Sequence, residues 1–387
     1  MRHFRRAVIG VGLLTIGLCS QARAQQVLEQ VPSDAVGVFE VKDLQGLSTK
    51  IAKLAKTLGI DQFQPQWADP LGSLQDQMGV KQGLNKHGDM AIAFFNPKQN
   101  GGKEGPPGGE QVPPLVVLLP TDDYKAFLGN FQDVKDAGND ISEVTVPKNS
   151  EKLFIVHRGN YAEAAMKKEL LGKPAGMKLE GPAAKEAKDR DAILYFDMKS
   201  VRPHLQEGYK QFRGEIQKQL KENNPMGAQL PPGMLALLDK AAGQFISDAS
   251  SLALVFNLND AGLATTFVSN FEPDSYFGKL MSQAKNTDQP MLAGLPQRTY
   301  LMYFGAVITP QVADQLMDDV IKTLKEHPGK GDQEAISRYF EDSRQYMDAT
   351  RSIAGGMVAP EPGESFLQMV GVSKGDAQKI FDAGKRV

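Results

Sequence analysis

The sequence contains little of what covalent cross-links and metal centres are made from. Among its 387 residues there are one cysteine, Cys19, and five histidines. A single cysteine excludes an internal disulfide and a zinc site built on several cysteines. A chain of this length does not need disulfides, because several hundred residues bury enough apolar surface to fold without them.

Long apolar runs and an excess of basic charge are also missing. The main apolar run, Ala7–Leu18, has 12 residues and falls short of the roughly 20 that a membrane-spanning helix needs. The formal net charge is −2, and lysine and arginine form no basic cluster of the kind that binds nucleic acids. The sequence therefore predicts no nucleic-acid partner, and no transmembrane segment in the mature chain.

The N-terminus does have the pattern of a secretory signal peptide. Arg2, Arg5 and Arg6 precede the apolar run, and Ala22-Arg23-Ala24 follows it as a small-residue cleavage site. We predict that residues 1–24 are a signal peptide that is cleaved after Ala24. A secreted or periplasmic protein is therefore expected, and the sequence does not distinguish the two locations.

Two other export signals fit this N-terminus less well. A lipoprotein signal would have a small residue before the cysteine, whereas Cys19 follows Leu18. The residues that flank Arg5-Arg6 differ from a twin-arginine signal. Cleavage after residue 24 removes the cysteine and four of the 44 basic residues. The mature chain then has 40 basic against 46 acidic residues, a net charge of −6.

The stretch Ser251–Met281 predicts a hairpin followed by a short helix, and its pattern recurs. It contains two apolar strands, a tight turn at Asn259–Gly262 and a helix that opens near Glu272. Looser versions lie at 89–131 and 352–383, and each version is preceded by a strand and two helical stretches. We therefore predict an α+β protein of repeated β-α-α-β-β-α units, with antiparallel sheets packed against helices.

Each predicted unit begins with a short apolar strand and a helix that starts at a capping residue. The strands are expected to be covered on both faces, because their apolar residues are nearly continuous. The expected caps, Asp43, Ser200 and Thr309, follow the three strands at similar distances.

The predicted domains are 25–180, 181–290 and 291–387. The first has an additional hairpin, 141–158, followed by a predicted helix at 161–171. The third lacks an equivalent addition. Either the architecture ends there, or the chain is a shortened form of a longer one.

The segment Pro97–Pro114 is rich in glycine and proline and has the composition of a linker. Its place in the first unit corresponds to the tight turn Asn259–Gly262 of the second. We therefore interpret 97–114 as an enlarged, mobile hairpin loop within one domain.

Several of these residues carry a resemblance to a known family. They are the opening Val31–Val36, the paired strands before Asp122-Asp123-Tyr124, and the run Leu153–Tyr161. The chain resembles a family of exported bacterial proteins usually described as a domain of unknown function. The resemblance implies an exported α+β protein, and it supplies no activity and no catalytic residues.

The histidines and the acidic pairs give no sign of a metal site. The histidines after residue 24 form no H-x-H or H-x-x-x-H pair, and each is interpreted as structural. Adjacent carboxylates on a helix point about 100° apart and do not converge on a cation. The residues concerned are His87, His157, His204, His327, Asp122-Asp123, Asp318-Asp319, Glu341-Asp342 and the turn Asn257–Asp260.

Glu40 and Asp197 are the candidates for acid–base chemistry. They occupy matching places at the ends of the first two predicted strands, where a carboxyl group with a raised pKa can move protons. The third unit has Gly305 there, so the pattern does not support a shared role. The sequence has no G-x-S-x-G motif and no phosphate-binding glycine loop. No catalytic, cofactor-binding or metal-binding residue is predicted.

Three functions remain open at this stage. The leading hypothesis is a non-enzymatic binding or scaffold protein of the cell envelope, whose partner, an envelope protein or an apolar ligand, the sequence does not identify. The alternatives are an envelope hydrolase that uses Glu40 or Asp197, and a carrier of apolar ligands. Converging buried carboxylates would favour the hydrolase, and an enclosed apolar cavity would favour the carrier. An open sheet edge or an exposed apolar patch would favour the scaffold.

Overall fold

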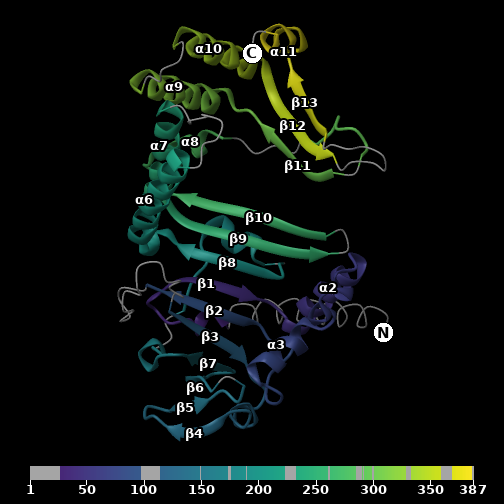
Figure 1. Cartoon of the computed structure of the whole chain (residues 1–387), viewed down its shortest axis with the longest axis vertical. Coiled ribbons are helices and arrows are strands. Elements are labelled where there is room, and N and C mark those ends of the chain that lie inside the picture. Colours follow the sequence, from purple (N-terminus) through teal and green to yellow (C-terminus); the bar gives the residue numbers. More distant parts are fainter. Residues whose placement is uncertain are drawn as a thin grey trace, which may run out of the picture. The chain divides into compact units, whose positions relative to one another are not determined.

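The protein is described from a computed structural model of the whole chain (Figure 1). The predicted signal peptide, most of the predicted loop 97–114 and the tip of the 259–262 turn lie outside the described residues. No helix among the described residues is long and apolar enough to cross a membrane. The structure describes residues 27–96, 114–148, 150–172, 176–188, 190–222, 232–259, 262–284, 290, 292–298, 300–327, 333–358 and 368–385.

The protein is an α+β protein, as predicted, and its chain forms two compact units. The first unit comprises 1–203 and 249–270, and the second comprises 204–248 and 271–387. The predicted domain 181–290 is thus divided between the two units: its strands belong to the first and most of its helices to the second.

The first unit contains a ten-stranded sheet in the order β10-β9-β8-β1-β2-β3-β7-β6-β5-β4. All pairings from β9 to β4 are antiparallel. The strands are β1 (Ala35–Val41), β2 (Met90–Phe95), β3 (Leu115–Pro120), β4 (Gln132–Asp136), β5 (Ile141–Thr145), β6 (Lys152–Arg158), β7 (Tyr161–Ala165), β8 (Ala192–Asp197), β9 (Ala249–Asn259) and β10 (Gly262–Phe271).

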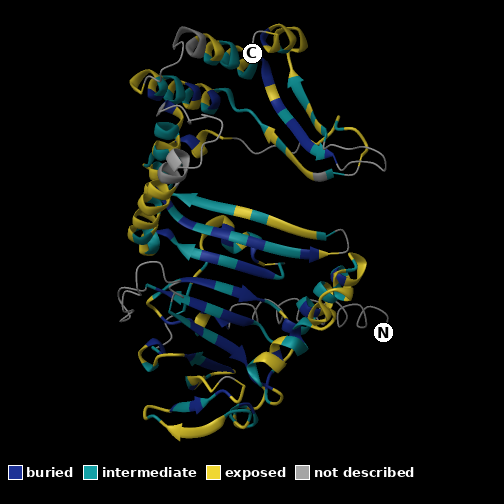
Figure 2. Ribbon diagram, in the orientation of Figure 1, coloured by how far each residue is buried: buried dark blue, intermediate teal, exposed yellow. Residues whose placement is uncertain are grey.

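Both faces of the central strands are covered, as their continuous apolar character predicts (Figure 2). On one face, called face A, Val38 and Leu118 pack in a core that includes Val27–Val31 and residues of the 170–187 segment. On the other, called face B, Val41 packs with side chains of the helices. Neighbouring residues of a strand point to opposite faces, so each strand contributes to both cores.

The face-B helices begin at aspartates. In each case the carboxylate accepts a hydrogen bond of 3.0 Å from a backbone N–H three residues later, at Asp43, Asp69 and Asp123. The cap predicted at Asp43 is confirmed. The helices of this unit are α2 (Leu44–Thr57), α3 (Pro70–Met78), α4 (Tyr124–Leu128) and α5 (Gly181–Glu186), with short 3₁₀ turns at Ile60–Gln62, Pro65–Ala68 and Lys168–Leu170.

The second unit combines helices with a three-stranded antiparallel sheet in the order β11-β12-β13. Its strands are β11 (Tyr300–Val307), β12 (Thr350–Val358) and β13 (Gln368–Gly375). Its helices are α7 (Pro232–Asp248), α8 (Tyr276–Gln283), α9 (Pro310–Glu326), α10 (Gln333–Ala349), α11 (Ala377–Gly384) and the larger part of α6 (Met198–Glu222).

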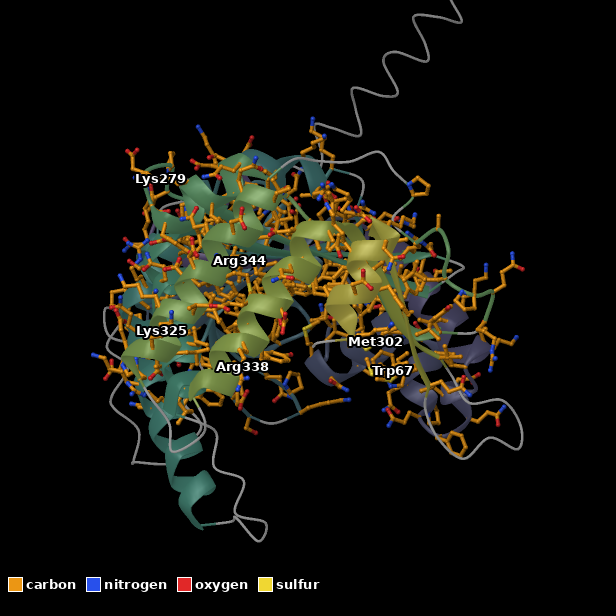
Figure 3. All side chains as sticks on the ribbon, turned by 90° about the horizontal axis from the view of Figure 1, so that it is seen from above. Trp67, Lys279, Met302, Lys325, Arg338 and Arg344 are labelled. Carbon is orange, nitrogen blue, oxygen red and sulfur yellow. The ribbon has the colours of Figure 1, made fainter. Side chains whose placement is uncertain are left out.

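Aromatic contacts and an ion pair connect elements of this unit. Phe245, Phe271 and Phe277 form a ring cluster with centroids 5.2 to 6.2 Å apart. Arg344 of α10, labelled in Figure 3, forms an ion pair with Asp318 of α9.

Two local predictions were wrong. The segment 161–171 was expected to be a helix, but Tyr161–Ala165 forms β7, which pairs with β3 and β6. Ser200 was expected to cap a helix, but α6 begins at Met198 and Asp197 accepts the hydrogen bond from the backbone N–H of Lys199 at 3.0 Å. In the first case the strand partners β3 and β6 outweigh the local helical pattern, and in the second the neighbouring Asp197 takes the capping position.

The described elements follow the predicted order in three series. These are β1-α2-α3-β2-β3-α4, β8-α6-α7-β9-β10-α8 and β11-α9-α10-β12-β13-α11, with 3₁₀ turns between α2 and α3. That the three series are related repeats stays a prediction, because a shared order of elements is common among α+β folds.

Candidate functional site

The two carboxylates singled out from the sequence do not meet. Glu40 lies within β1 and is 1% exposed. Asp197 ends β8, where its second oxygen accepts a hydrogen bond of 2.6 Å from the Ser200 hydroxyl. Glu40 pairs across the sheet with Ile193, four residues before Asp197, which places the two acids about 13 Å apart along the strand direction. Asp197 is therefore a helix-start residue and not a partner of Glu40.

A second buried glutamate, Glu163, was missed in the sequence. It lies on β7, is 0% exposed, and neither of its carboxylate oxygens has a hydrogen-bond partner within the described part of the chain. Glu163 was missed because 161–171 was expected to be a helix, and a glutamate on a solvent-exposed helix is ordinary. The alternation of Tyr161, Glu163 and Ala165 on one strand face was the signal that could have found it.

Glu40 and Glu163 lie in one cross-strand row on face A. The register runs Glu40–Ala91–Leu118–Glu163 across four adjacent strands. Three strand spacings separate the two glutamates, or about 14 Å. Paired catalytic carboxylates work about 5 to 9.5 Å apart, so this row does not form an acid–base pair.

The environment of these two glutamates favours their neutral form. Burial raises the pKa of Glu40 to about 7, Lys42 acts in the opposite direction, and Asp89 raises it further. Burial likewise raises the pKa of Glu163 to about 7, against the lowering effect of Arg158. Both groups can therefore take up or release a proton near neutral pH.

Other polar groups lie near the Glu40 end of this row. Lys42 donates hydrogen bonds to the carbonyl oxygens of Ala187 at 2.7 Å and Lys188 at 3.1 Å, which ties the segment after α5 to β1. Burial, and then the charges of Asp89 and Glu40, raise the pKa of the Tyr161 phenol. Lys42 thus holds backbone in place at one end of the row.

Three of the four histidines named from the sequence have contacts that the structure describes. His87 Nδ1 lies 3.2 Å from Asp43, and both side chains are more than half exposed. His157 stacks on the ring of Tyr124 at 4.3 Å. His327 Nδ1 lies 3.1 Å from the Thr323 carbonyl oxygen.

Three residues of the acidic pairs make specific contacts. Asp123 caps α4, and Asp318 pairs with Arg344. Asp319 accepts hydrogen bonds from Lys240 at 3.0 Å and from the Tyr276 hydroxyl at 2.5 Å. Within the described ranges, no group of three or more histidine, cysteine, aspartate or glutamate side chains is placed to hold a metal ion.

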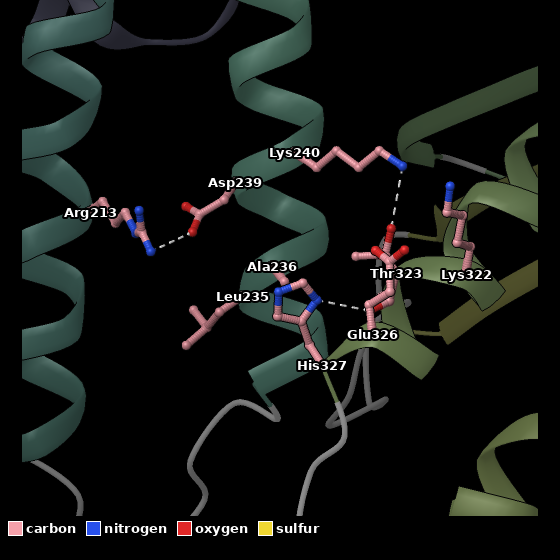
Figure 4. A pocket seen from close by; sticks show the side chains of 9 residues that line it. All are labelled: Arg213, Leu235, Ala236, Asp239, Lys240, Lys322, Thr323, Glu326 and His327. Atoms are coloured by element: carbon pink, nitrogen blue, oxygen red, sulfur yellow. Dashed lines mark hydrogen bonds and ion pairs between the residues drawn. The ribbon is translucent and has the colours of Figure 1, made fainter.

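The second unit has a pocket of about 470 Å³ between α6, α7 and α9 (Figure 4). Opposite charges meet in or next to it, because Arg213 pairs with Asp239 at 2.9 Å and Lys240 with Asp319 at 3.0 Å. Two of its nine lining residues are aliphatic, so it differs from the enclosed apolar cavity that a lipid carrier would have. It is lined by Arg213, Leu235, Ala236, Asp239, Lys240, Lys322, Thr323, Glu326 and His327.

The outer edges of the two sheets differ in charge. β4 and β13 each carry charged residues, with Asp133, Lys135 and Asp136 on β4 and Lys374 on β13. β10 (GLATTFVSNF) and β11 (YLMYFGAV) carry none. Charged residues protect an edge strand from pairing with other chains, so β4 and β13 are protected, whereas β10 and β11, which are the outer strands of their sheets among the described strands, lack this protection.

Large apolar side chains accompany the open edges. On β10, Leu263 is 59% exposed and Phe267 is 58% exposed, and both point to the same side of the sheet. β10 is ten residues long, about twice the usual strand. A long, uncharged edge strand that exposes apolar side chains can accept a further strand by main-chain hydrogen bonds.

Comparisons with protein-family models, with curated proteins and with solved structures give no match. The resemblance to exported proteins of unknown function therefore stays a prediction from the strand and helix pattern. Within the described part of the chain, β10 is an uncharged outer strand, and Glu40 lies about 13 Å from Asp197 along the strands and about 14 Å from Glu163 across them.

Proposed function

We propose that this protein is an exported, non-enzymatic binding or scaffold protein of the cell envelope. Its binding element is the free edge of β10, which takes an extended segment of a partner protein as an additional strand. The observation that carries the proposal is the β10 edge, which is long and uncharged and exposes Leu263 and Phe267 on one side of the sheet.

The chemistry of the edge defines the partner segment. Its backbone supplies the hydrogen bonds of the new strand pair, which do not depend on sequence. Its side chains must be apolar at alternate positions, to cover Leu263 and Phe267 on one side of the sheet. A flexible, uncharged segment of about six to ten residues meets these conditions.

The two alternative functions have less support. A hydrolase that uses Glu40 or Asp197 would be favoured by converging carboxylates, and these two lie about 13 Å apart along the sheet. A carrier of apolar ligands would need an apolar cavity, and the pocket of the second unit is lined mainly by charged and polar groups.

Strand capture is tested by selecting random decapeptides on the immobilised mature protein and titrating the strongest binder. We expect it to contain alternating apolar residues, and to bind Phe267→Lys at least tenfold more weakly, since a charge then faces the added strand. The matched control is Val134→Lys on β4, an edge that already carries charge. Equal binding to the wild type and to Phe267→Lys would overturn the proposal.

The proposal that the protein is exported rests on the pattern of residues 1–24 and is tested separately. N-terminal sequencing of the protein recovered from the envelope or the culture medium of a bacterial expression host is expected to begin at Gln25. Recovery of a chain that retains residues 1–24 in the cytoplasm would contradict it.

A further inference from the structure

The edge of the second sheet carries a separate inference. β11 is the outer strand of the three-stranded sheet, and its only described strand neighbour is β12. Met302, Tyr303 and Phe304 on β11 are each more than half exposed. No charged residue protects this edge, whereas β13 at the opposite edge carries Lys374.

The first sheet shows how a strand in this position is completed. β1 and β8 are the first strands of their series, and they pair antiparallel from Gly37–Phe196 to Val41–Ala192. The pairing joins β3-β2-β1 and β8-β9-β10 into one run of six strands. β11 is the first strand of the third series, but among the described strands it still ends its sheet.

We propose that two copies of this chain associate by antiparallel pairing of β11 with β11. A strand without charge is suited to pairing with itself, because a two-fold axis between identical strands places no like charges opposite each other. The same axis keeps equivalent faces of the two sheets on the same side, so that a six-stranded sheet results.

An apolar row on the sheet supports a second copy as the occupant. Met302, Met357 and Met369 face one another across β11, β12 and β13. Phe304 lies on the same face, two residues along β11, and packs over Gly355, where an added Cβ would come within 2.9 Å of its ring. Pairing through β11 joins the two methionine rows into one continuous apolar surface across both copies.

The size of the contact determines how the association must be measured. A strand pair eight residues long falls below the roughly 1,200 Å² of total buried surface found in the smaller specific interfaces. Association is therefore weak and depends on protein concentration. It does not rest on strand capture at β10, because the two edges belong to different sheets.

The test is sedimentation velocity of the mature protein over a roughly hundredfold range of concentration. We expect the weight-average mass of the wild type to rise from one chain toward two. Met302→Lys and Tyr303→Lys, on opposite faces of β11, are each expected to weaken association at least tenfold, because two lysines then meet at the two-fold axis. Thermal unfolding checks that the variants fold, and the exposure of both positions favours this.

Two matched controls assign the effect to the β11 edge. Met369→Lys places the same charge in the same row but on β13, and Phe267→Lys places it on β10. Both are expected to associate like the wild type. A monomeric wild type at every concentration would overturn the proposal, and so would association that survives Met302→Lys and Tyr303→Lys. Loss of association in Met369→Lys equal to that in Met302→Lys would also overturn it, since the apolar face and not the edge would then be responsible.

Discussion

Glu40 and Glu163 give the first sheet a specific dependence on pH. In the unfolded chain both carboxyl groups ionise near their ordinary pKa of 4.5, whereas in the folded chain burial raises their pKa to about 7. Between these values the folded state binds more protons than the unfolded state. The free energy of unfolding therefore falls as the pH rises from about 4.5 to about 7.

We predict that Glu40→Gln and Glu163→Gln are more stable than the wild type at about pH 8. A neutral amide removes the cost of ionising a buried carboxyl, which is on the order of 3 kcal/mol for each group. The advantage is expected to disappear at about pH 3, which lies below the pKa of both states, so that the wild-type carboxyl groups are protonated whether the chain is folded or unfolded. Urea unfolding at the two pH values measures the difference.

Glu143→Gln on β5 is the matched control for this prediction. A hydrogen bond from Lys152 and the charge of that lysine lower the pKa of Glu143, which is the opposite direction. This control is expected to show no gain in stability at alkaline pH. A similar gain in all three variants would show that general charge, and not burial, is responsible.

Single residues with a local role could be predicted from the sequence, and those with a distant role could not. The cap at Asp43 follows from the residue type and the helix next to it. Glu163 lies between two other strands, where it is paired with Leu118 on β3 and with Val156 on β6. No window of the local sequence contains those partners.

Among the elements, the segments with strong periodicity were predicted and β7 was not. Its sequence, YAEAA, is made mainly of alanine and glutamate, which favour helices. Ladder hydrogen bonds from β3 and β6 on its two sides outweigh that preference. The hairpin of β5 and β6 was predicted correctly, because its two strands are adjacent in sequence and flank the turn-forming segment Pro147–Ser150.

The pairing of β1 with β8 depends on a glycine at its outer end. An added Cβ at Gly37 would lie 2.3 Å from the Phe196 ring and 2.8 Å from the Tyr195 carbonyl oxygen. The ring can move but the backbone oxygen cannot move without disturbing the strand pair. Gly37 is thus required for the close approach of these two strands.

We predict that Gly37→Ala lowers the free energy of unfolding by about 1 to 3 kcal/mol, as is usual for overpacking. Chemical denaturation measures the change. Gly208→Ala on α6 is the control, since nothing lies within 4 Å of its added Cβ and alanine favours a helix by about 1 kcal/mol. A Gly37→Ala protein as stable as the wild type would show that the strands separate here without cost.

At the scale of the whole molecule, the sequence indicated the fold class but not the division of the chain. The predicted boundary between the domains 25–180 and 181–290 falls in the segment 172–189, whose glycine and proline residues are typical of linkers. The contacts place β8 and β9 with β1, so the first unit continues past that point. The division of the chain into two units depends on strand pairs that are far apart in the sequence, and local composition does not reveal such pairs.

The long stretch of sequence between β1 and its partner β8 affects folding during synthesis. Val41 and Ala192 are paired neighbours although 151 positions separate them, and the chain between β8 and β9 includes residues 204–248 of the other unit. During synthesis from the N-terminus, β1 must therefore wait for most of the first unit to appear before its second edge is paired. Contacts of such long sequence separation fold slowly. A nascent chain that stops before β8 would present β1 as an open, mostly apolar edge, and this is the stage at which the protein is most exposed to aggregation.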